Sequence, residues 1–391
     1  MIKKVVILWL ALLMLDTLGA SAQPKEEWNK TYGGPGDESG FAIQEIKDYG
    51  YIIVGKTDSF GTGKDDIWLI KTDSKGNELW NRTFGGPRDD IGYSIQETSD
   101  SGYIIAGLTE SYGAGGKDIW LIKANSKGDK EWDRTFGKPS DDICWSIQET
   151  SDHGYILLGD TKSYNAGDLD IWLIKTDSNG TKMWDRTFGK SGNDAGRSVK
   201  QTKDGGYVIA GWTELKDIDK AYVWIIKTDP SGTELWNKTI GGSSWDGARS
   251  IQETKDGGYI VIGDTRQKDA NDQDIWLIKT DSKGNEEWNK TFGGSDVDWG
   301  MSVQQARDGG YIIAGETRSY GTGGSDAWVI KTDQNGIEQW NRTFGSTGTS
   351  GAFLAQEADD DEYIMLGDTD SYGSGGFDIF MVKMKLSNLK K

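Results

Sequence analysis

The amino-acid sequence predicts an all-β fold built from seven copies of one four-stranded unit. The first observation is a spacing of 52 residues between equivalent aromatic residues along nearly the whole chain. The second is that each period holds four short segments with strand-like composition, separated by turn residues. The third is that no window of useful length shows the 3.6-residue periodicity of an amphipathic helix. These observations together indicate a repeat protein made of strands.

Three aromatic series define the repeat and run without insertion or deletion. One tryptophan series is Trp28, Trp80, Trp132, Trp184, Trp236, Trp288 and Trp340. A second, which ends with phenylalanine, is Trp68, Trp120, Trp172, Trp224, Trp276, Trp328 and Phe380. The tyrosine series is Tyr51, Tyr103, Tyr155, Tyr207, Tyr259, Tyr311 and Tyr363. Large aromatic side chains at matched positions are expected to pack between neighbouring sheets.

The second copy shows the four expected strands in order. Residues 94–98 form the first, and a polar turn leads to the second, residues 103–109, whose apolar run suits a strand buried on both faces. A glycine-rich loop precedes the third, residues 118–123, and a turn with Gly128 precedes the fourth, residues 131–136. Four antiparallel strands per repeat describe one blade of a β-propeller, and seven blades lie within the usual range of about 4 to 8.

The two ends of the chain predict how the ring closes. Residues 26–32 match the fourth strand of a blade, whereas residues 378–383 match the third. The last blade therefore needs an outer strand, which the N-terminal segment supplies, and this pairing protects both sheet edges. The sequence thus predicts one seven-bladed propeller domain over residues 23–385, with three C-terminal strands and one N-terminal strand in the last blade. A short basic tail, residues 386–391, follows it.

Residues 1–22 read as a cleavable secretory signal. Lys3 and Lys4 precede an apolar run over residues 5–15, and an A-x-A pattern ends at Ala22. The apolar run is too short for a bilayer span, although an uncleaved anchor is the alternative. We expect a secreted or cell-surface protein that does not insert into a membrane after signal cleavage.

Charge and rare residues narrow the functional classes. The formal net charge of −18 argues against nucleic acid and anionic lipid as partners and is compatible with binding cations. The single cysteine, Cys144, excludes an internal disulfide, and the single histidine, His153, removes most histidine-based triads and metal sites. No catalytic constellation is legible, and we expect a monomer.

The repeat pattern itself resembles a known family. The stretch DIWLIKTDSKGNELWNRTFGG and the later SIQETSDSGYIIAG are similar to the secreted β-propeller repeats of bacteria and archaea called SBBP-type repeats. The resemblance covers all seven copies, residues 26–385, and implies a surface or secreted propeller rather than a particular activity. The G-x-x-x-W pattern of residues 76–80 also resembles, more loosely, the repeats of quinoprotein propellers. Those proteins usually have eight blades and a dedicated cofactor pocket, which this sequence does not show.

The loops between blades carry an acid in six of seven copies, and Ser350 is the exception. The acids are Glu38, Asp90, Asp142, Asp194, Asp246 and Asp298. Around one mouth of a propeller channel they could form a ring that attracts Ca²⁺, the one cofactor the sequence suggests. The alternative is that each carboxylate caps backbone amides where successive blades meet. A role repeated in every blade favours this architectural alternative.

Departures from the repeat mark a candidate ligand site. Four tryptophans lie outside the two series: Trp145, Trp212, Trp245 and Trp299. Arg197 and Arg249 occupy the position of Trp145 in the next two blades, and charged loops over residues 215–222 and 267–274 lie in the same sector. Aromatic side chains with polar neighbours on one face suit a stacking surface for sugar rings or a peptide. The alternative is that these tryptophans fill gaps near the channel.

Six N-x-[ST] sequons permit glycosylation of an exported chain. They begin at Asn29, Asn81, Asn179, Asn237, Asn289 and Asn341. Asp133 and Asp185 replace the asparagine in two copies and cannot carry a glycan, so a polar edge role would serve all seven copies.

The sequence therefore predicts an exported, non-enzymatic propeller that binds a carbohydrate, a peptide or a cell-surface polymer through one face. One alternative is a polysaccharide lyase or glycoside hydrolase that uses paired carboxylates at the channel mouth. Another is a structural component of the cell surface.

Overall fold

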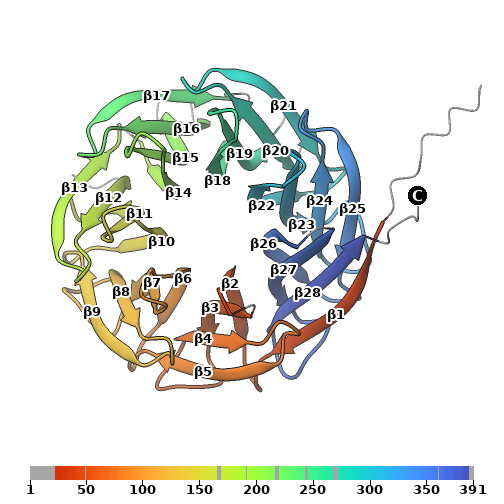
Figure 1. Cartoon of the computed structure of the whole chain (residues 1–391), viewed down its shortest axis with the longest axis horizontal. Coiled ribbons are helices and arrows are strands. Elements are labelled where there is room, and N and C mark those ends of the chain that lie inside the picture. Colours follow the sequence, from red (N-terminus) through yellow and green to blue (C-terminus); the bar gives the residue numbers. More distant parts are fainter. Residues whose placement is uncertain are drawn as a thin grey trace, which may run out of the picture.

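Seven four-stranded antiparallel sheets stand in a ring around a common axis in the computed structural model (Figure 1). The structure describes residues 23–48, 50–164, 169–190, 192–215, 220–242, 245–266, 272–359 and 361–386. The predicted signal, residues 1–22, lies outside the described residues. No helix in these ranges is long and apolar enough to cross a bilayer. The predicted all-β, seven-bladed architecture is confirmed.

The first six blades follow the chain, each from its innermost to its outermost strand. Blade 1 is β2 (Glu38–Glu45), β3 (Tyr51–Thr57), β4 (Asp66–Thr72) and β5 (Glu78–Phe84). Blade 2 is β6 (Asp90–Glu97), β7 (Tyr103–Thr109), β8 (Asp118–Ala124) and β9 (Lys130–Phe136). Blade 3 is β10 (Asp142–Glu149), β11 (Tyr155–Thr161), β12 (Asp170–Thr176) and β13 (Lys182–Phe188).

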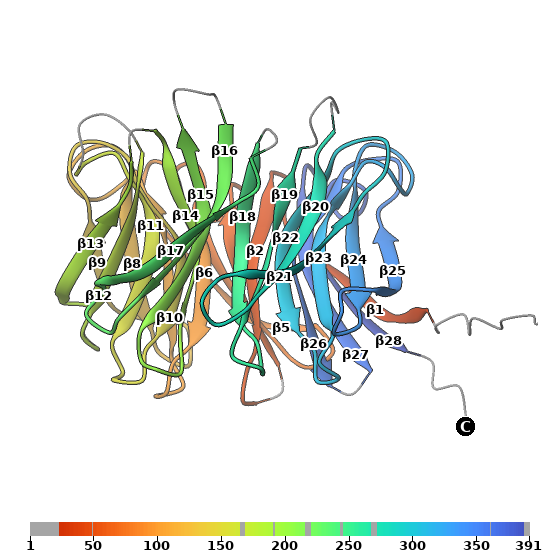
Figure 2. The same ribbon diagram turned by 90° about the horizontal axis from the view of Figure 1, so that it is seen from above.

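Blade 4 is β14 (Asp194–Gln201), β15 (Tyr207–Leu215), β16 (Lys220–Thr228) and β17 (Glu234–Ile240). Blade 5 is β18 (Asp246–Glu253), β19 (Tyr259–Thr265), β20 (Asp274–Thr280) and β21 (Glu286–Phe292). Blade 6 is β22 (Asp298–Gln305), β23 (Tyr311–Thr317), β24 (Asp326–Thr332) and β25 (Glu338–Phe344). The longer β15–β16 hairpin rises above one face of the ring (Figure 2).

Blade 7 joins the two ends of the chain. It contains β26 (Ser350–Asp359), β27 (Glu362–Thr369), β28 (Asp378–Leu386) and, outermost, β1 (Pro24–Tyr32). Strand β1 pairs antiparallel with β28, and Trp28 lies opposite Lys383. The predicted closure is confirmed. β28 extends to Leu386, one residue into the predicted tail, because Leu386 pairs with Pro24; residues 387–391 lie outside the described residues.

Each innermost strand begins earlier than the sequence predicted. In blade 2 it starts at Asp90 rather than at residue 94, because Asp90 already pairs with Thr109. The register then skips Tyr93, which is the extra residue of a β-bulge between Gly92 and Ser94. The same bulge occurs at the equivalent place in all seven blades. The bulge breaks the strand pattern and so hid the first half of the strand.

The repeated aromatic residues form the contacts between sheets, as predicted. Trp80 on the outer strand of blade 1 meets Tyr103 of blade 2 edge-on, with ring centroids 6.1 Å apart. Trp120 of the second series is 1% exposed and donates its indole N–H to Asp133 at 3.0 Å. Trp120 packs against Ile52 and Leu69 of blade 1, so the two tryptophan series fill the space between neighbouring blades.

Candidate functional site

The β-bulges present one side chain per blade at one mouth of the channel. A bulge redirects a side chain out of the regular ladder and is frequent beside functional sites. The seven bulge residues are all half-buried: Phe41, Tyr93, Trp145, Arg197, Arg249, Met301 and Phe353. They lie near the start of the innermost strands, beside the loops that connect successive blades. The mouth is therefore lined by seven equivalent positions that carry five residue types: Phe, Tyr, Trp, Arg and Met.

Five of the bulge residues form a continuous arc. Phe353 contacts Phe41 with ring centroids 5.4 Å apart, and Phe41 contacts Tyr93 at 5.1 Å. Tyr93 contacts Trp145 at 4.5 Å. The guanidinium of Arg197 then lies 4.6 Å from the centre of the Trp145 ring, which is a cation–π contact. The aromatic arc of blades 7, 1, 2 and 3 thus ends on an arginine in blade 4.

A buried aspartate fixes the end of this arc. The Oδ2 atom of Asp160 accepts the indole N–H of Trp145 at 2.7 Å and a guanidinium N–H of Arg197 at 2.7 Å. Its Oδ1 atom accepts the backbone N–H of Gly196 at 2.8 Å. Since both oxygens are used, Asp160 holds the two side chains in one geometry and balances the arginine charge.

A related arrangement occurs two blades later, with the arginine and the aspartate on the same blade. Asp264 accepts hydrogen bonds from Arg249 Nε at 3.0 Å and lies 2.9 Å from Arg249 Nη2. Its second oxygen accepts the backbone N–H of Gly300 at 2.9 Å. Both mouth arginines are therefore held by buried carboxylates, and each pair is close to neutral.

Between these two arginines lies a cavity of about 340 Å³, here called the mouth cavity. Its lining is Arg197, Trp212, Trp245, Gly247, Ala248, Arg249, Asp264 and Gln273. The rings of Trp212 and Trp245 are 5.2 Å apart and inclined at 50°, and Trp245 is 38% exposed. A Cβ atom on Gly247 would lie 3.5 Å from Trp212, so this glycine leaves the face of Trp212 open.

The structure thus brings four of the six predicted ligand residues into one cavity, and the other two border it. Trp145 contacts Arg197, as described above. Trp299 donates its indole N–H to the lining residue Gln273 at 3.0 Å, and Arg318 lies 5.0 Å over its ring. Of the two charged loops, residues 216–219 and 267–271 lie outside the described residues. Whether the six residues bind a ligand stays a prediction.

The six predicted metal-ring acids, Glu38, Asp90, Asp142, Asp194, Asp246 and Asp298, are all completely buried. Asp90 is representative: it accepts the backbone N–H of Gly86 at 2.8 Å, the Ser111 hydroxyl at 2.6 Å and the Thr109 hydroxyl. Where the acid is missing, Ser350 pairs with Thr369 at 2.7 Å. These contacts are those of the architectural alternative. No group of three or more His, Cys, Asp or Glu in the described part of the chain is arranged to hold a metal, and Ca²⁺ binding stays a prediction.

Three of the sequon asparagines, Asn237, Asn289 and Asn341, each accept the indole N–H of a core tryptophan. In Asn237, the side-chain oxygen accepts the indole N–H of Trp224 at 3.2 Å, and the amide donates to Glu234 at 2.6 Å. Asp133 and Asp185 accept the equivalent indole N–H in their blades, at 3.0 and 2.9 Å, which explains why either residue type serves here. Asn29, Asn81, Asn179, Asn237 and Asn289 are exposed and Asn341 is half-buried. Glycosylation stays a prediction.

Two acids at the mouth, Glu316 and Asp368, are not among the predicted site residues. Glu316 and Asp368 occupy, in blades 6 and 7, the second-strand position that Trp212 holds in blade 4. Asp368 Oδ1 lies 3.4 Å and Glu316 Oε2 lies 3.6 Å from the place where a Cβ on Gly351 would be. Burial, reinforced by Glu316, raises the pKa of Asp368 to about 7, and burial also raises the pKa of Glu316. The 52-residue spacing does carry a signal for this pair, because Glu316 and Asp368 are acids at a position that holds lysine, leucine or tryptophan in blades 1, 2 and 4.

Cys144 and His153 do not form a nucleophilic site in the structure. Cys144 is fully buried and burial raises its thiol pKa to about 12, which disfavours the reactive thiolate. His153 sits in a turn with φ of 63°, and its Nδ1 lies 3.1 Å from Ser99 Oγ on the surface.

Comparison with known sequences does not show a family for this chain. No family model matches the chain, so the resemblance to SBBP-type repeats stays a prediction. Regulatory protein FlaEY of Caulobacter vibrioides is 25% identical over 201 residues. The match covers 44% of this chain and 21% of FlaEY, so the chain spans about a fifth of that protein's length.

Comparison with solved structures supports the fold. An ulvan lyase bound to a GlcA(1-4)Rha3S saccharide superimposes with a TM-score of 0.58 and 10% identity, over 90% of this chain and 95% of that one. YCF48 bound to a D1 peptide gives 0.52 and 13%, over 94% and 99%. A protein of unknown function from Dyadobacter fermentans gives 0.51 and 9%, over 93% and 99%. At these identities the likeness shows a β-propeller and no particular activity.

Proposed function

We propose that this protein is an exported binding propeller that holds a carbohydrate chain in the mouth cavity. The observation that carries the proposal is that Trp212 and Trp245, which both depart from the repeat, line one cavity together with Arg197 and Arg249. Neither tryptophan is needed to form a blade, because the other blades form the same four-stranded sheet with different residues at these positions.

The chemistry of the cavity suits a sugar. Aromatic faces pack against the C–H face of a pyranose, and Trp245 exposes such a face. Sugar hydroxyls need donors and acceptors in fixed places, which Arg197, Arg249 and Gln273 supply. Because Asp160 and Asp264 fix the two arginines, these donors are already oriented before a ligand arrives, which reduces the entropy lost on binding.

The competing ligand class is a peptide. Among the structural neighbours one holds a saccharide and one holds a peptide, so the propeller fold accommodates both. The mouth cavity favours the sugar because its lining has two tryptophans and several planar polar groups, and no deep aliphatic pocket for a peptide side chain. Export rests on the predicted signal at residues 1–22.

A glycan array followed by calorimetry on the best ligand tests this function. Trp245→Ala and Trp212→Ala should each weaken binding at least tenfold, since loss of a central aromatic contact costs about 2 kcal/mol or more. The matched control is Tyr112→Ala, because Tyr112 is an exposed aromatic (46%) in blade 2, far around the ring from the cavity. Unchanged binding in both tryptophan variants would reject the mouth cavity, and capture of peptides alone would reject the sugar.

A second candidate function is supported by Glu316 and Asp368. Glycoside hydrolases use two carboxyls about 5–9.5 Å apart, one protonated and one ionised at the working pH. The raised pKa of Asp368, about 7, suits the protonated member, and Gly351 leaves space beside both groups. The test is release of reducing ends from a polysaccharide panel. Activity that Glu316→Gln and Asp368→Asn both abolish would establish an enzyme; activity that survives both would exclude this pair.

A further inference from the structure

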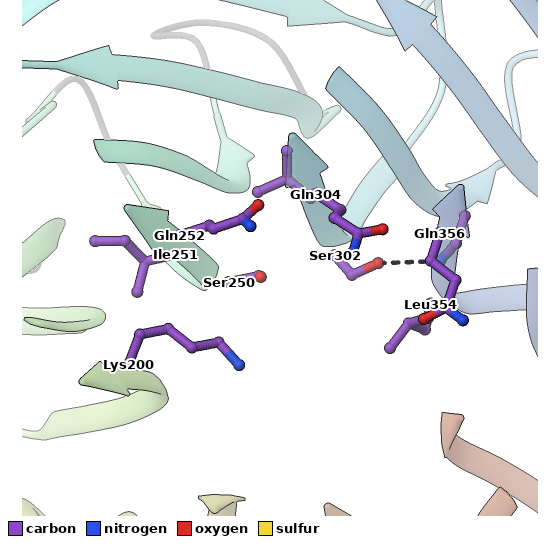
Figure 3. Close-up of a pocket in the computed structure, with 10 residues that line it drawn as sticks. Lys200, Ser250, Ile251, Gln252, Ser302, Gln304, Leu354 and Gln356 are labelled. Atoms are coloured by element: carbon purple, nitrogen blue, oxygen red, sulfur yellow. Dashed lines mark hydrogen bonds between the residues drawn. The ribbon is translucent and has the colours of Figure 1, made fainter. Parts of the chain in front are cut away.

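A second cavity lies deeper along the axis, between the innermost strands of blades 4 to 7. It has a volume of about 350 Å³ and is here called the channel cavity. Its lining includes Lys200 on β14, Ser250 and Gln252 on β18, and Gln304 on β22. Figure 3 shows the Lys200 side chain reaching from its strand toward the space that these residues line.

Lys200 replaces a glutamine that every other blade carries. The equivalent residues are Gln44, Gln96, Gln148, Gln252, Gln304 and Gln356. In several blades this glutamine joins one sheet to the next: Gln148 Oε1 accepts the backbone N–H of Gln201 at 2.7 Å, and Gln252 Oε1 accepts that of Gln305 at 2.7 Å. A lysine ammonium accepts no hydrogen bond. Lys200 therefore gives up a contact that the scaffold makes elsewhere.

The Lys200 ammonium has no partner among the described residues. The side chain is half-buried, and this partial burial lowers its pKa. Five lysines that are more deeply buried than Lys200 each lie 2.8–3.1 Å from an aspartate: Lys123, Lys175, Lys227, Lys279 and Lys331. An uncompensated cation in a confined space is unfavourable, and an anion placed beside it would relieve that cost.

The channel cavity and the mouth cavity share two strands. On β14, Arg197 lines the mouth cavity and Lys200 lines the channel cavity; on β18, Arg249 and Ser250 do the same. Arg197 is already paired with Asp160, and Arg249 with Asp264. Lys200 is therefore the cation on these two strands that remains available to a ligand. A ligand seated between the tryptophans therefore has an open cation farther down the same wall.

We propose that the channel cavity binds the carboxylate of a uronic acid residue in the bound glycan, with Lys200 as its charged contact. The Ser250 hydroxyl and the side-chain amides of Gln252 and Gln304 would hydrogen-bond the remaining oxygens. This inference rests on the proposed carbohydrate function and specifies its ligand as an acidic polysaccharide. An acidic peptide also carries carboxylates, and the experiment below distinguishes it from a uronic acid.

Lys200→Gln is an unusually clean test because it restores the residue that six blades already carry. Binding of an oligogalacturonate and of a neutral galactan oligomer of equal length would be measured by calorimetry on the full chain. We expect the acidic ligand to bind about ten- to a hundredfold more weakly to the variant, the range for loss of a charged hydrogen bond. Binding of the neutral ligand should not change. Lys127→Gln, which removes one charge from an exposed turn, should affect neither.

A second readout does not depend on the variant. Acetylation of lysines, mapped by mass spectrometry, should be slowed at Lys200 by the oligogalacturonate and not by the neutral oligomer. Equal uronate binding in the parent and Lys200→Gln would overturn this inference, while loss of binding in Trp245→Ala would leave the carbohydrate function standing. Protection of Lys200 by an acidic peptide but not by the uronate would also overturn it. If neither Trp212→Ala nor Trp245→Ala changes sugar binding, the proposed function itself fails.

Discussion

One position on the second strand of each blade decides the charge at the channel mouth. Its seven residues are Lys56, Leu108, Asp160, Trp212, Asp264, Glu316 and Asp368. Asp160 and Asp264 each form an ion pair with an arginine, whereas Glu316 and Asp368 lie near one another and burial raises the pKa of both carboxyl groups. The same backbone position therefore anchors a cation in two blades and brings two carboxyl groups with raised pKa values together in two others. The resulting mouth has distinct sectors, although the fold has sevenfold repetition.

Asp368→Asn should flatten the dependence of stability on pH. The folded protein holds the Asp368 proton up to about pH 7, while an unfolded chain releases it near pH 4. The stabilisation from this group is therefore complete below about pH 4 and is lost as the pH rises toward 7. Relative to the variant, the parent should lose up to about 1.4 kcal/mol per pH unit across that window.

Urea unfolding at several pH values between 4 and 7 measures this difference. Asp129→Asn changes the same charge at an exposed site and should keep the parent slope. Parallel curves for the parent and Asp368→Asn would mean that Asp368 is ionised throughout the window in the folded protein.

At the scale of a strand pair, the β-bulge explains a glycine that occurs in all seven copies. In blade 3, a Cβ on Gly159 would lie 1.8 Å from the carbonyl oxygen of Ile143, on the strand that bulges. Similar distances hold for the equivalent glycines of the other blades. A glycine inside a strand often marks a bulge or a close backbone approach. The repeated glycine could thus have predicted the bulge, and with it the true start of each innermost strand.

Gly159→Ala should destabilise the protein by about 1–3 kcal/mol or more, the cost of forcing an extra methyl into a filled space. Strands β10 and β11 would have to separate, and Trp145 at the bulge would move with them. The control is Gly247→Ala, whose new Cβ would meet its nearest neighbour at 3.5 Å, an ordinary contact. Urea midpoints decide the matter: equal midpoints for the two variants would mean that the bulge is easily rearranged.

At the scale of the whole molecule, the sequence was sufficient for the architecture. The 52-residue spacing set the number of blades, and the unmatched strands at the two ends set the closure. The convergence of Arg197, Trp212, Trp245 and Arg249 on one cavity needed the structure, because these residues lie on different strands and their side chains meet only across blades. The sequence does not single out Lys200 for another reason: a lysine in place of a glutamine is an ordinary surface substitution, and only the structure shows that it has no partner among the described residues.

Removal of residues 23–32 should open the ring. The deletion exposes the edge of β28 and removes Tyr32, which is 7% exposed and donates its hydroxyl hydrogen bond to Gly76 O at 2.7 Å. It also removes the contact between Trp28 and Tyr51, whose ring centroids are 6.5 Å apart. We expect a lower melting temperature and self-association through the exposed edge, measured by calorimetry and light scattering.

A synthetic peptide of residues 23–32 should reverse both effects by taking the place of β1. A deletion variant that stays monomeric and melts at the parent temperature would show that the closure adds little to the stability of the ring.

The bulge also bears on how such a protein can diversify. A bulged residue leaves the ladder, so exchange of its side chain disturbs few of the contacts that hold a blade together. Duplication of one blade would first give a mouth with seven identical side chains. Later substitutions at Phe41 and its six counterparts could then alter recognition one blade at a time while the ring persisted. Single substitutions at the seven bulge positions can therefore change ligand specificity in related propellers without loss of the fold.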